Sequence, residues 1–209
     1  MSDLASTDLL ALSPVIPVVV VETVDQAVPV ARALAEGGVP LVELTLRTPV
    51  ALDAIRAIAA EVPEVVIGAG TVTTPELAKE AAAAGAQFLV SPGATPTLLG
   101  AMRDTGLPFL PGTATVSEAL AVLETGHTAM KFFPAEASGG VKFLGSLASV
   151  LPDVRFCPTG GISLATAPSY LGLHNVGCVG GSWLTPAEAL ASGDWDRVTA
   201  LAAATAALR

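Results

Sequence analysis

The sequence is poor in charge and especially in lysine, of which it has only three. Of its 209 residues 14% are charged, and ten lysines and arginines stand against nineteen acids, giving a net charge of −9. Nucleic-acid binding needs clustered cations, so this acidic balance disfavours a nucleic-acid partner. An apolar share of 52% excludes an intrinsically disordered chain, because burial on that scale can offset the entropy of ordering.

Long uninterrupted apolar runs are also missing, although the mean hydropathy is +0.65. Residues 81–102 and 156–187 contain no Asp, Glu, Lys or Arg, but glycine and proline interrupt both, so neither resembles a membrane span. The first thirteen residues lack the basic segment of a secretory signal. The two cysteines, Cys157 and Cys178, lie in apolar runs without a CxxC motif. We therefore expect reduced core cysteines in a cytoplasmic protein that does not bind a membrane.

The chain repeats one alternation of short β-branched runs and Ala/Leu-rich helical stretches. The predicted strands are residues 15–21, 39–45, 65–70, 87–91, 108–112, 129–134, 155–160 and 176–180. The predicted helices are residues 24–36, 49–61, 75–84, 96–104, 116–124, 141–150, 163–171 and 196–208. This alternation indicates parallel strands with crossover helices, in a closed barrel or an open doubly wound sheet. Eight evenly spaced units favour an α/β fold of the (β/α)8 TIM-barrel type, a single domain over residues 1–209 with residues 1–13 as an N-terminal extension.

Several predicted helix boundaries carry capping signals. A threonine precedes a proline at three helix starts (Thr74, Thr95 and Thr185), and Thr115 with Glu118 has the capping-box spacing. Glycines typical of left-handed C-caps follow four helices, at Gly37-Gly38, Gly85, Gly106 and Gly126.

In such a barrel the chemistry lies at the C-terminal ends of the strands, where Lys131 is the most informative residue. It interrupts an apolar strand, and alternation points it into the barrel if Met130 and Phe132 pack outward against helices. Burial of an ammonium is costly and favours the neutral amine, which is a nucleophile toward carbonyl carbon. Position alone leaves two interpretations open: a Schiff-base lysine, or a lysine that reaches a strand end or pairs with an acid.

Glu43 is a second ionisable residue inside an apolar strand. If it points inward, it would meet Lys131 across the barrel interior. The pair could be a structural ion pair, whose net contribution to stability is doubtful. It could equally be an amine nucleophile beside a general acid/base, because imine formation, carbon–carbon cleavage and imine hydrolysis all require proton transfers.

Two glycine pairs, Gly160-Gly161 and Gly180-Gly181, end the last two predicted strands. Loops at these positions of a barrel often bind phosphate. Because residues 156–187 contain no lysine or arginine, backbone amides, hydroxyls and helix N-termini would have to hold that anion. Tight turns with positive φ would explain the same glycines without a ligand. Arg47, just past the second strand, could clamp a carboxylate or lie on the surface.

Two other classes of site lack their sequence signals. No cluster of His, Asp and Glu has metal-ligand spacing, and His127 and His174 precede strands, on the face away from the chemistry. No GxGxxG motif follows the first strand, which disfavours a dinucleotide. The sequence therefore predicts neither a metal nor a cofactor.

Read together, the strand ends resemble the family of 2-keto-3-deoxy-6-phosphogluconate (KDPG) and 4-hydroxy-2-oxoglutarate aldolases. The resemblance extends from about Pro14 to the C-terminus and is most specific around Lys131 and Thr159. Its motifs are Glu43-Leu44-Thr45-Leu46-Arg47-Thr48, Gly68-Ala69-Gly70-Thr71-Val72, Ser91-Pro92-Gly93, Lys131-Phe132-Phe133-Pro134-Ala135-Glu136, Arg155-Phe156-Cys157-Pro158-Thr159-Gly160-Gly161 and Gly180-Gly181-Ser182-Trp183-Leu184.

The resemblance implies a metal-free class I aldolase that forms a homotrimer and acts on a small phosphorylated sugar acid. By motif position, Lys131 would form an imine with the C2 ketone of KDPG, and Glu43 would move protons. The products would be pyruvate and glyceraldehyde 3-phosphate, while 4-hydroxy-2-oxoglutarate is a second candidate substrate, cleaved to pyruvate and glyoxylate. The implied substrate-binding residues are Arg47, Thr71 and Pro92 for the carboxylate, Phe133 for the reacting carbons, Gly160, Gly161, Gly180, Gly181 and Ser182 for the phosphate, and Thr159.

Two departures and three alternatives remain open at this point. Family members often carry a basic residue at the end of the first strand, where this chain has Val19-Val20-Val21-Glu22. The fifth strand ends Gly112-Thr113-Ala114-Thr115, where family members tend to have a different residue after the glycine. Lys142 is a rival nucleophile. A phosphate-binding isomerase or epimerase could use Glu43 without an imine, and a trimeric barrel could be a non-catalytic scaffold.

Overall fold

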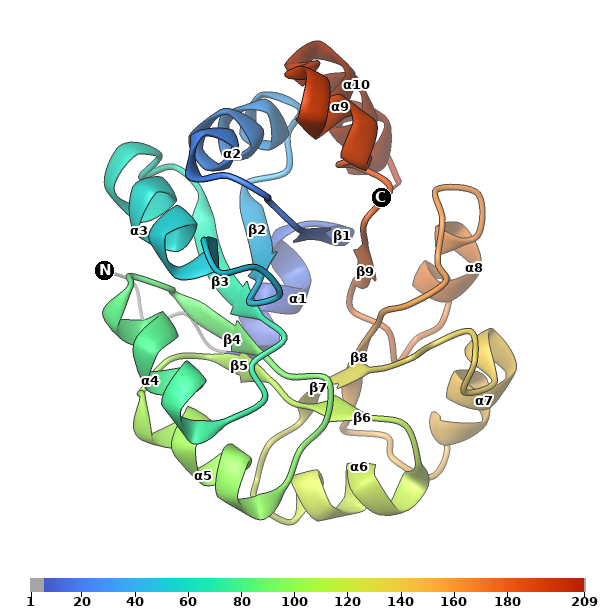
Figure 1. Ribbon diagram of the computed structural model, residues 1–209. Coiled ribbons are helices and arrows are strands. Elements are labelled where there is room, and N and C mark those ends of the chain that lie inside the picture. Colours follow the sequence, from blue (N-terminus) through green and yellow to red (C-terminus); the bar gives the residue numbers. More distant parts are fainter. Residues whose placement is uncertain (1–5, 209) are drawn as a thin grey trace.

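The computed structural model describes residues 6–208, which form an α/β fold with parallel strands at the centre and helices around them (Figure 1). The strands are β1 (Val15–Val19), β2 (Leu41–Thr45), β3 (Val66–Gly70), β4 (Phe88–Val90), β5 (Phe109–Leu110), β6 (Gly112–Thr113), β7 (Ala129–Phe132), β8 (Arg155–Pro158) and β9 (Val179–Gly181). The helices are α1 (Ser6–Leu12), the 3-10 helix η1 (Val24–Gln26), α2 (Ala27–Glu36), α3 (Ala51–Glu61), α4 (Pro75–Ala83), α5 (Pro96–Asp104), α6 (Val116–Leu123), α7 (Gly140–Leu147), α8 (Ala167–Leu171), α9 (Ala187–Ser192) and α10 (Trp195–Ala206).

The strands form two parallel sheets, one of six strands in the order β5-β4-β3-β2-β1-β9 and one of three in the order β6-β7-β8. The predicted strand at 108–112 is divided into β5 and β6 by Pro111, which cannot donate a hydrogen bond to a ladder. Between β8 and β9, Thr159 bridges Gly180 at a single position. The parallel α/β class is as predicted, and the order of the strands brings all their C-terminal ends to one side.

The central strands are mostly apolar and are covered on both sides. Every residue of β1 and β2 is buried. On the outward face of β7, Phe132 stacks on Phe143 of α7 with ring centroids 5.4 Å apart, and Met130 is fully buried. The outward packing predicted for Met130 and Phe132 is therefore present, which leaves Lys131 facing the interior.

Most of the predicted caps are confirmed. Thr74 and Thr95 each accept a backbone hydrogen bond at 3.2 Å, and Thr115 forms a capping box with Glu118. The prediction for Thr185 is wrong, because α9 is preceded by Pro186 with no side-chain cap and Thr185 is buried instead. Positive φ angles are found at Gly38, Gly85, Gly106 and Gly126, as left-handed C-caps require.

The predicted helix at 163–171 is helical only over Ala167–Leu171. Ser163 and Thr166 exchange hydrogen bonds between their backbone amides and hydroxyls at 3.0 and 3.3 Å. These local bonds offer the backbone an alternative to the helical pattern, so the segment forms a turn before α8. The short helix α9 was not predicted.

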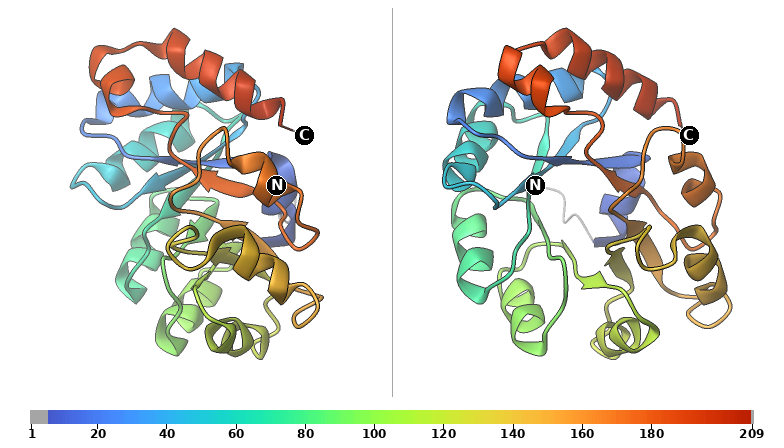
Figure 2. Two further views of the ribbon diagram at one scale, coloured as in Figure 1. Left: turned by 90° about the vertical axis from the view of Figure 1, so that its right-hand side faces the viewer. Right: turned by 45° about the vertical axis from the view of Figure 1, so that its right-hand side comes forward.

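The two ends of the described chain pack against the body of the fold. In α1, which lies within the predicted extension 1–13, Leu9 and Leu10 are buried, and Ser6 accepts a hydrogen bond from the Phe109 amide. Residues 1–5 of that extension lie outside the described residues. The last helix, α10, lies along α2 (Figure 2), where a Cβ at Gly37 would be 2.4 Å from the Ala202 methyl group.

Cys157 and Cys178 both lie buried in the core, as predicted. Within residues 6–208, no helix is both long and apolar enough to cross a membrane.

Candidate active site

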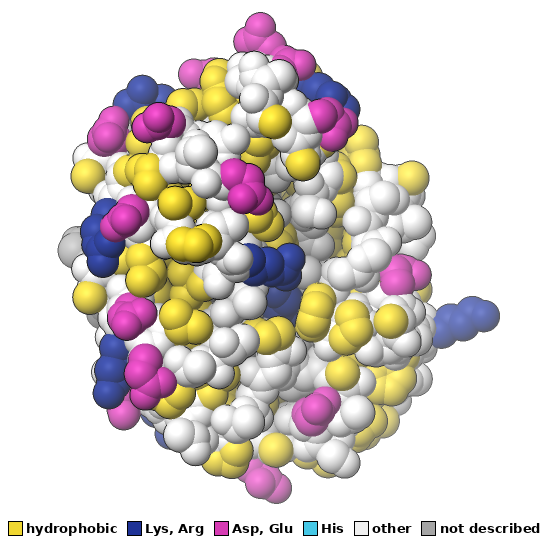
Figure 3. Space-filling model, viewed as in Figure 1, with side chains coloured by type: hydrophobic (Ala, Val, Ile, Leu, Met, Phe, Trp, Pro, Cys, Tyr) yellow, Lys and Arg dark blue, Asp and Glu magenta, His cyan; other side chains and the backbone are white. Residues whose placement is uncertain are grey.

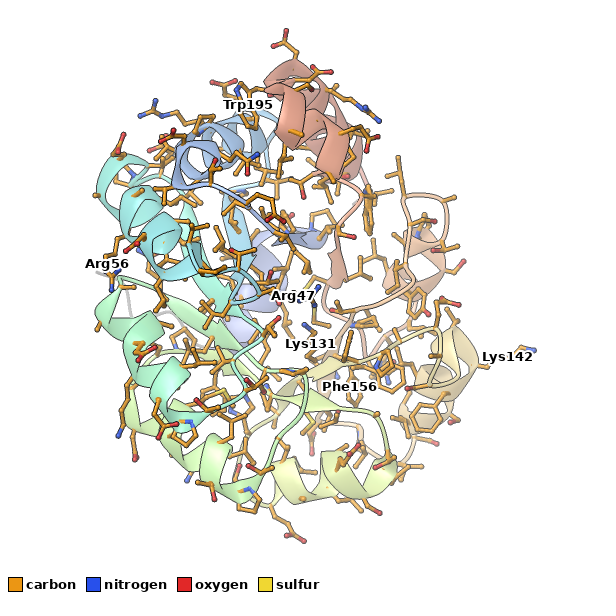
Figure 4. All side chains as sticks on the ribbon, in the orientation of Figure 1. Arg47, Arg56, Lys131, Lys142, Phe156 and Trp195 are labelled. Atoms are coloured by element: carbon orange, nitrogen blue, oxygen red, sulfur yellow. The ribbon has the colours of Figure 1, made fainter. Side chains whose placement is uncertain are left out.

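Two buried charged side chains from different sheets meet at the centre of the fold. Lys131 comes from β7 and Glu43 from β2, and their side chains are 5% and 2% exposed. The Lys131 Nζ donates a hydrogen bond to the Glu43 Oε1 at 3.2 Å. The contact expected from strand alternation is therefore present. In Figure 4, Lys131 and Arg47 lie at the centre of the molecule, whereas Lys142 projects outward from α7.

The surroundings of this pair are sparse in other polar partners. Among the described residues, neither the Lys131 amine nor the Glu43 carboxylate makes a second hydrogen bond. The Lys131 Nζ lies 5.3 Å from the centroid of the Phe133 ring. The amine thus contacts one carboxylate and one aromatic face.

Gly70, at the end of β3, makes room for the Glu43 carboxylate. A Cβ built on Gly70 would lie 2.2 Å from the Glu43 Oε1 and 2.6 Å from its Cγ, far inside van der Waals contact. In the sequence, the run of small residues at the end of β3 indicates that this strand end needs space. The run alone does not reveal that the Glu43 side chain fills it.

We expect Gly70→Ala to displace the Glu43 carboxylate from the Lys131 amine. Because misplacement of a catalytic group by about 1 Å can cost a factor of about 10², kcat should fall about 10- to 100-fold. Steady-state kinetics of substrate turnover measures this. Gly100→Ala is the matched control, since a Cβ there meets nothing within 4 Å. An unchanged kcat for Gly70→Ala would contradict the role given to Gly70.

Arg47 is held over the site by Thr71. The Arg47 Nε donates to the Thr71 Oγ1 at 3.2 Å, although the Arg47 side chain is exposed. Thr71 has φ of 58°, in the left-handed region that costs a β-branched residue energy and is found mainly at functional sites. Figure 3 shows basic side chains inside the central hollow of this face. An anionic ligand would meet this positive charge first.

A pocket of about 400 Å³ opens at the C-terminal ends of the strands. Gly160 and Gly161 line it with φ of +105° and +81°, so their conformation favours glycine. Gly180 also must lack a side chain, because a Cβ there would be 2.1 Å from the Thr159 Oγ1. The lining residues are Val18, Val20, Arg47, Phe133, Thr159, Gly160, Gly161, Ile162, Gly180, Gly181 and Ser182.

The structure brings most of the predicted site residues to this pocket. Lys131 and Glu43 are not in its lining, but the Phe133 ring beside Lys131 is. Thr71 does not line the pocket itself but accepts a hydrogen bond from Arg47, which does. Pro92 does not line the pocket, and its carbonyl lies against Gly112.

Three lining residues were missed in the sequence. Val18 and Val20 share one face of the first predicted strand, and strand alternation could have placed them in the pocket. Ile162 follows the glycine turn, where no sequence signal points to it.

No group of three or more His, Cys, Asp or Glu side chains that could hold a metal ion occurs in the described part of the chain. His127 stacks on Phe109 with ring centroids 4.3 Å apart, and its Nε2 lies 2.9 Å from the Phe109 carbonyl oxygen. Burial lowers the pKa of His127 below its ordinary value. The charged side chains at the site are the Lys131 amine, the Glu43 carboxylate and the Arg47 guanidinium.

Comparisons with known proteins agree with this arrangement. The model of the KDPG and KHG aldolase family matches residues 7–201. The 2-dehydro-3-deoxy-phosphogluconate aldolase of Dickeya dadantii (strain 3937) is 54% identical over 95% of this chain and 93% of its own length. The KHG/KDPG aldolase of Escherichia coli (strain K12) is 53% identical over the same shares.

A solved structure is similarly close. The crystal structure of KDPG aldolase from Legionella pneumophila, with pyruvate captured at low pH as a covalent carbinolamine intermediate, has a TM-score of 0.94 and 45% identity and covers 96% of this chain and 98% of that one. The family model and these relatives each span nearly the whole sequence. The chain belongs to the KDPG and KHG aldolase family.

Proposed function

We propose that this protein is a class I aldolase that cleaves KDPG to pyruvate and glyceraldehyde 3-phosphate through an imine on Lys131. The observation that carries the proposal is the buried Lys131 amine, 3.2 Å from the Glu43 carboxylate and beneath a pocket lined by glycine turns. The carbinolamine captured in the Legionella pneumophila relative supports covalent chemistry on pyruvate.

The first stage joins the amine to the substrate. A proton first passes from the Lys131 amine to the Glu43 carboxylate. The amine then attacks the C2 ketone and forms a carbinolamine, and Glu43 donates this proton as the hydroxyl leaves as water. The resulting iminium draws electrons from the C3–C4 bond. A carboxylate in hydrogen-bond contact with the amine needs no large movement to serve this step.

The second stage breaks the carbon–carbon bond. Loss of the C4 hydroxyl proton, which Glu43 accepts, releases glyceraldehyde 3-phosphate as the C3–C4 electrons move into an enamine on Lys131. Glu43 then returns a proton to C3, and water hydrolyses the imine to give pyruvate and free Lys131. The carboxylate thus acts in turn as acid and base, as a single buried group beside the amine can.

The carboxylate and the phosphate of the substrate bind on different sides of the pocket. Arg47, positioned by Thr71, and Pro92 hold the carboxylate, while the Phe133 ring packs against the reacting carbons. Backbone amides of the turns at Gly160-Gly161 and Gly180-Gly181, with the Ser182 and Thr159 hydroxyls, hold the phosphate. When no cationic side chain is present, an anion is held by backbone amides that point into the concave side of a turn.

We also propose that the two sheets form one single-domain (β/α)8 barrel with residues 1–13 as an extension. The separation of β5 and β6 by one proline and the Thr159–Gly180 bridge support this closure, with β5 and β6 counted as one strand. The homotrimer and the cytoplasmic location stay predictions.

The test of the proposed function is covalent trapping. Incubation with pyruvate and sodium borohydride is expected to add one reduced pyruvyl group to Lys131, located by peptide mass spectrometry. Lys131→Met should give no adduct. The proposal would be contradicted if the unmodified protein gave no adduct, or gave one only on Lys79 or Lys142.

Cleavage of 4-hydroxy-2-oxoglutarate to pyruvate and glyoxylate is a second candidate activity. It is supported by the Escherichia coli relative, whose name includes both substrates. The same imine and the same proton transfers serve it, but its distal end is a C5 carboxylate in place of the C5 hydroxyl and phosphorylated C6 of KDPG.

A further inference from the structure

A tyrosine and a glutamate that the reaction does not use meet behind the glycine turn. Tyr170 lies on α8, and its side chain is fully buried. Its hydroxyl donates a hydrogen bond to the Oε1 of Glu136, a residue of the turn that follows β7. Glu136 is otherwise exposed. The sequence separates the two residues by 34 positions, so only the fold brings them together.

Glu136 is attached to the turn that is proposed to hold phosphate. Its amide donates to the Gly160 carbonyl oxygen at 3.1 Å. A Cβ built on Gly161 would lie 2.7 Å from the Glu136 Cγ. The stem of a negatively charged side chain therefore rests directly against an anion-binding turn, where a free carboxylate would repel a phosphate.

The carboxylate itself is turned away from the pocket. Both of its oxygens lie 3.8 Å from the Cβ position of Gly140, at the start of α7, and Glu136 is not part of the pocket lining. The Tyr170 hydroxyl is the donor that holds them there. Burial and the neighbouring Glu136 carboxylate raise the pKa of Tyr170, so the phenol keeps its proton across the neutral range.

We propose that Tyr170 is a positioning residue for phosphate selectivity, holding the Glu136 carboxylate away from the phosphate end of the substrate. This inference rests on the proposed function. Without the hydroxyl, the carboxylate can rotate toward the turn at Gly161 and oppose the phosphate dianion. A substrate that lacks the phosphate does not place a dianion at this turn and should be affected less.

The test compares Tyr170→Phe on the two substrates. The variant keeps the buried ring and removes only the hydroxyl. Its KM for KDPG should rise about three- to tenfold, the scale of a partly exposed like-charge contact. Its kcat, and its KM for 4-hydroxy-2-oxoglutarate, should stay within about twofold of the unmodified values.

A second variant separates charge from structure. Glu136→Gln retains an acceptor for the tyrosine but has no charge, so Tyr170→Phe in the Glu136→Gln background should leave the KM for KDPG near that of the unmodified protein. An increase that persists in this background, or an equal increase on both substrates, would overturn the proposal.

A titration with inorganic phosphate, monitored through the NMR shifts of the Gly161 and Gly181 amides, measures the effect of Glu136 on phosphate binding without turnover. Weaker binding by Tyr170→Phe that Glu136→Gln restores supports the positioning role, and equal binding by all variants overturns it. If the unmodified protein cleaves neither substrate, the proposed function fails, and the phosphate titration still decides the role of Tyr170.

Discussion

Replacing Lys131 with methionine is expected to lower kcat/KM for KDPG cleavage by about 10⁴-fold or more, because loss of a covalent nucleophile removes the whole imine pathway. Methionine has a side chain of similar length and fits an apolar strand, so the substitution removes the amine with little change of volume. Pyruvate production, measured with a coupled dehydrogenase assay, gives the result directly.

The same substitution also affects stability. It leaves the Glu43 carboxylate, only 2% exposed, without its cationic partner. Removal of one member of a buried ion pair typically destabilises a protein by about 3–5 kcal/mol. The double variant Lys131→Met/Glu43→Gln, in which no charge is left unpaired, should recover part of that loss in urea unfolding while remaining inactive.

Lys142→Met is the matched control for activity. Lys142 is exposed and projects from α7 away from the pocket, so its loss should leave kcat/KM unchanged. If Lys131→Met keeps its activity, the reaction does not pass through an imine on this residue. An isomerase or epimerase that uses Glu43 alone would then be the better interpretation.

The features that could be predicted from the sequence are those with a short-range cause. Alternation in one apolar strand placed Lys131 on the face opposite Met130 and Phe132, and the structure has all three as expected. The caps at Thr74 and Thr95 were predictable for the same reason, since a hydroxyl before a proline bonds to an amide only three residues away.

The features that could not be predicted depend on contacts between distant segments. The fit of Gly70 against the Glu43 carboxylate depends on the register of β2 and β3, in which Thr45 pairs with Gly70. The Tyr170–Glu136 hydrogen bond depends on how α8 is placed relative to the turn that follows β7. Thr185 carried a good local signal but is buried, because tertiary packing took precedence over the cap.

Glu43→Gln tests the second half of the catalytic pair and should lower kcat by about 10²- to 10⁴-fold, the usual contribution of a general acid/base. Glutamine has nearly the same shape, and its Oε1 can still accept a hydrogen bond from Lys131. It cannot carry a proton between carbinolamine, C4 hydroxyl and C3. The loss should therefore appear in kcat more than in KM.

Exchange of the pyruvate methyl protons with deuterium isolates this role, because exchange requires proton transfer at C3 of the enamine but no cleavage. In Glu43→Gln the exchange observed by NMR should fall with kcat, while borohydride still traps pyruvate on Lys131 after longer incubation. Glu80→Gln, on the exposed side of α4, is the control and should exchange normally. Normal exchange by Glu43→Gln would assign the proton transfers to another group and leave Glu43 as a structural partner of Lys131.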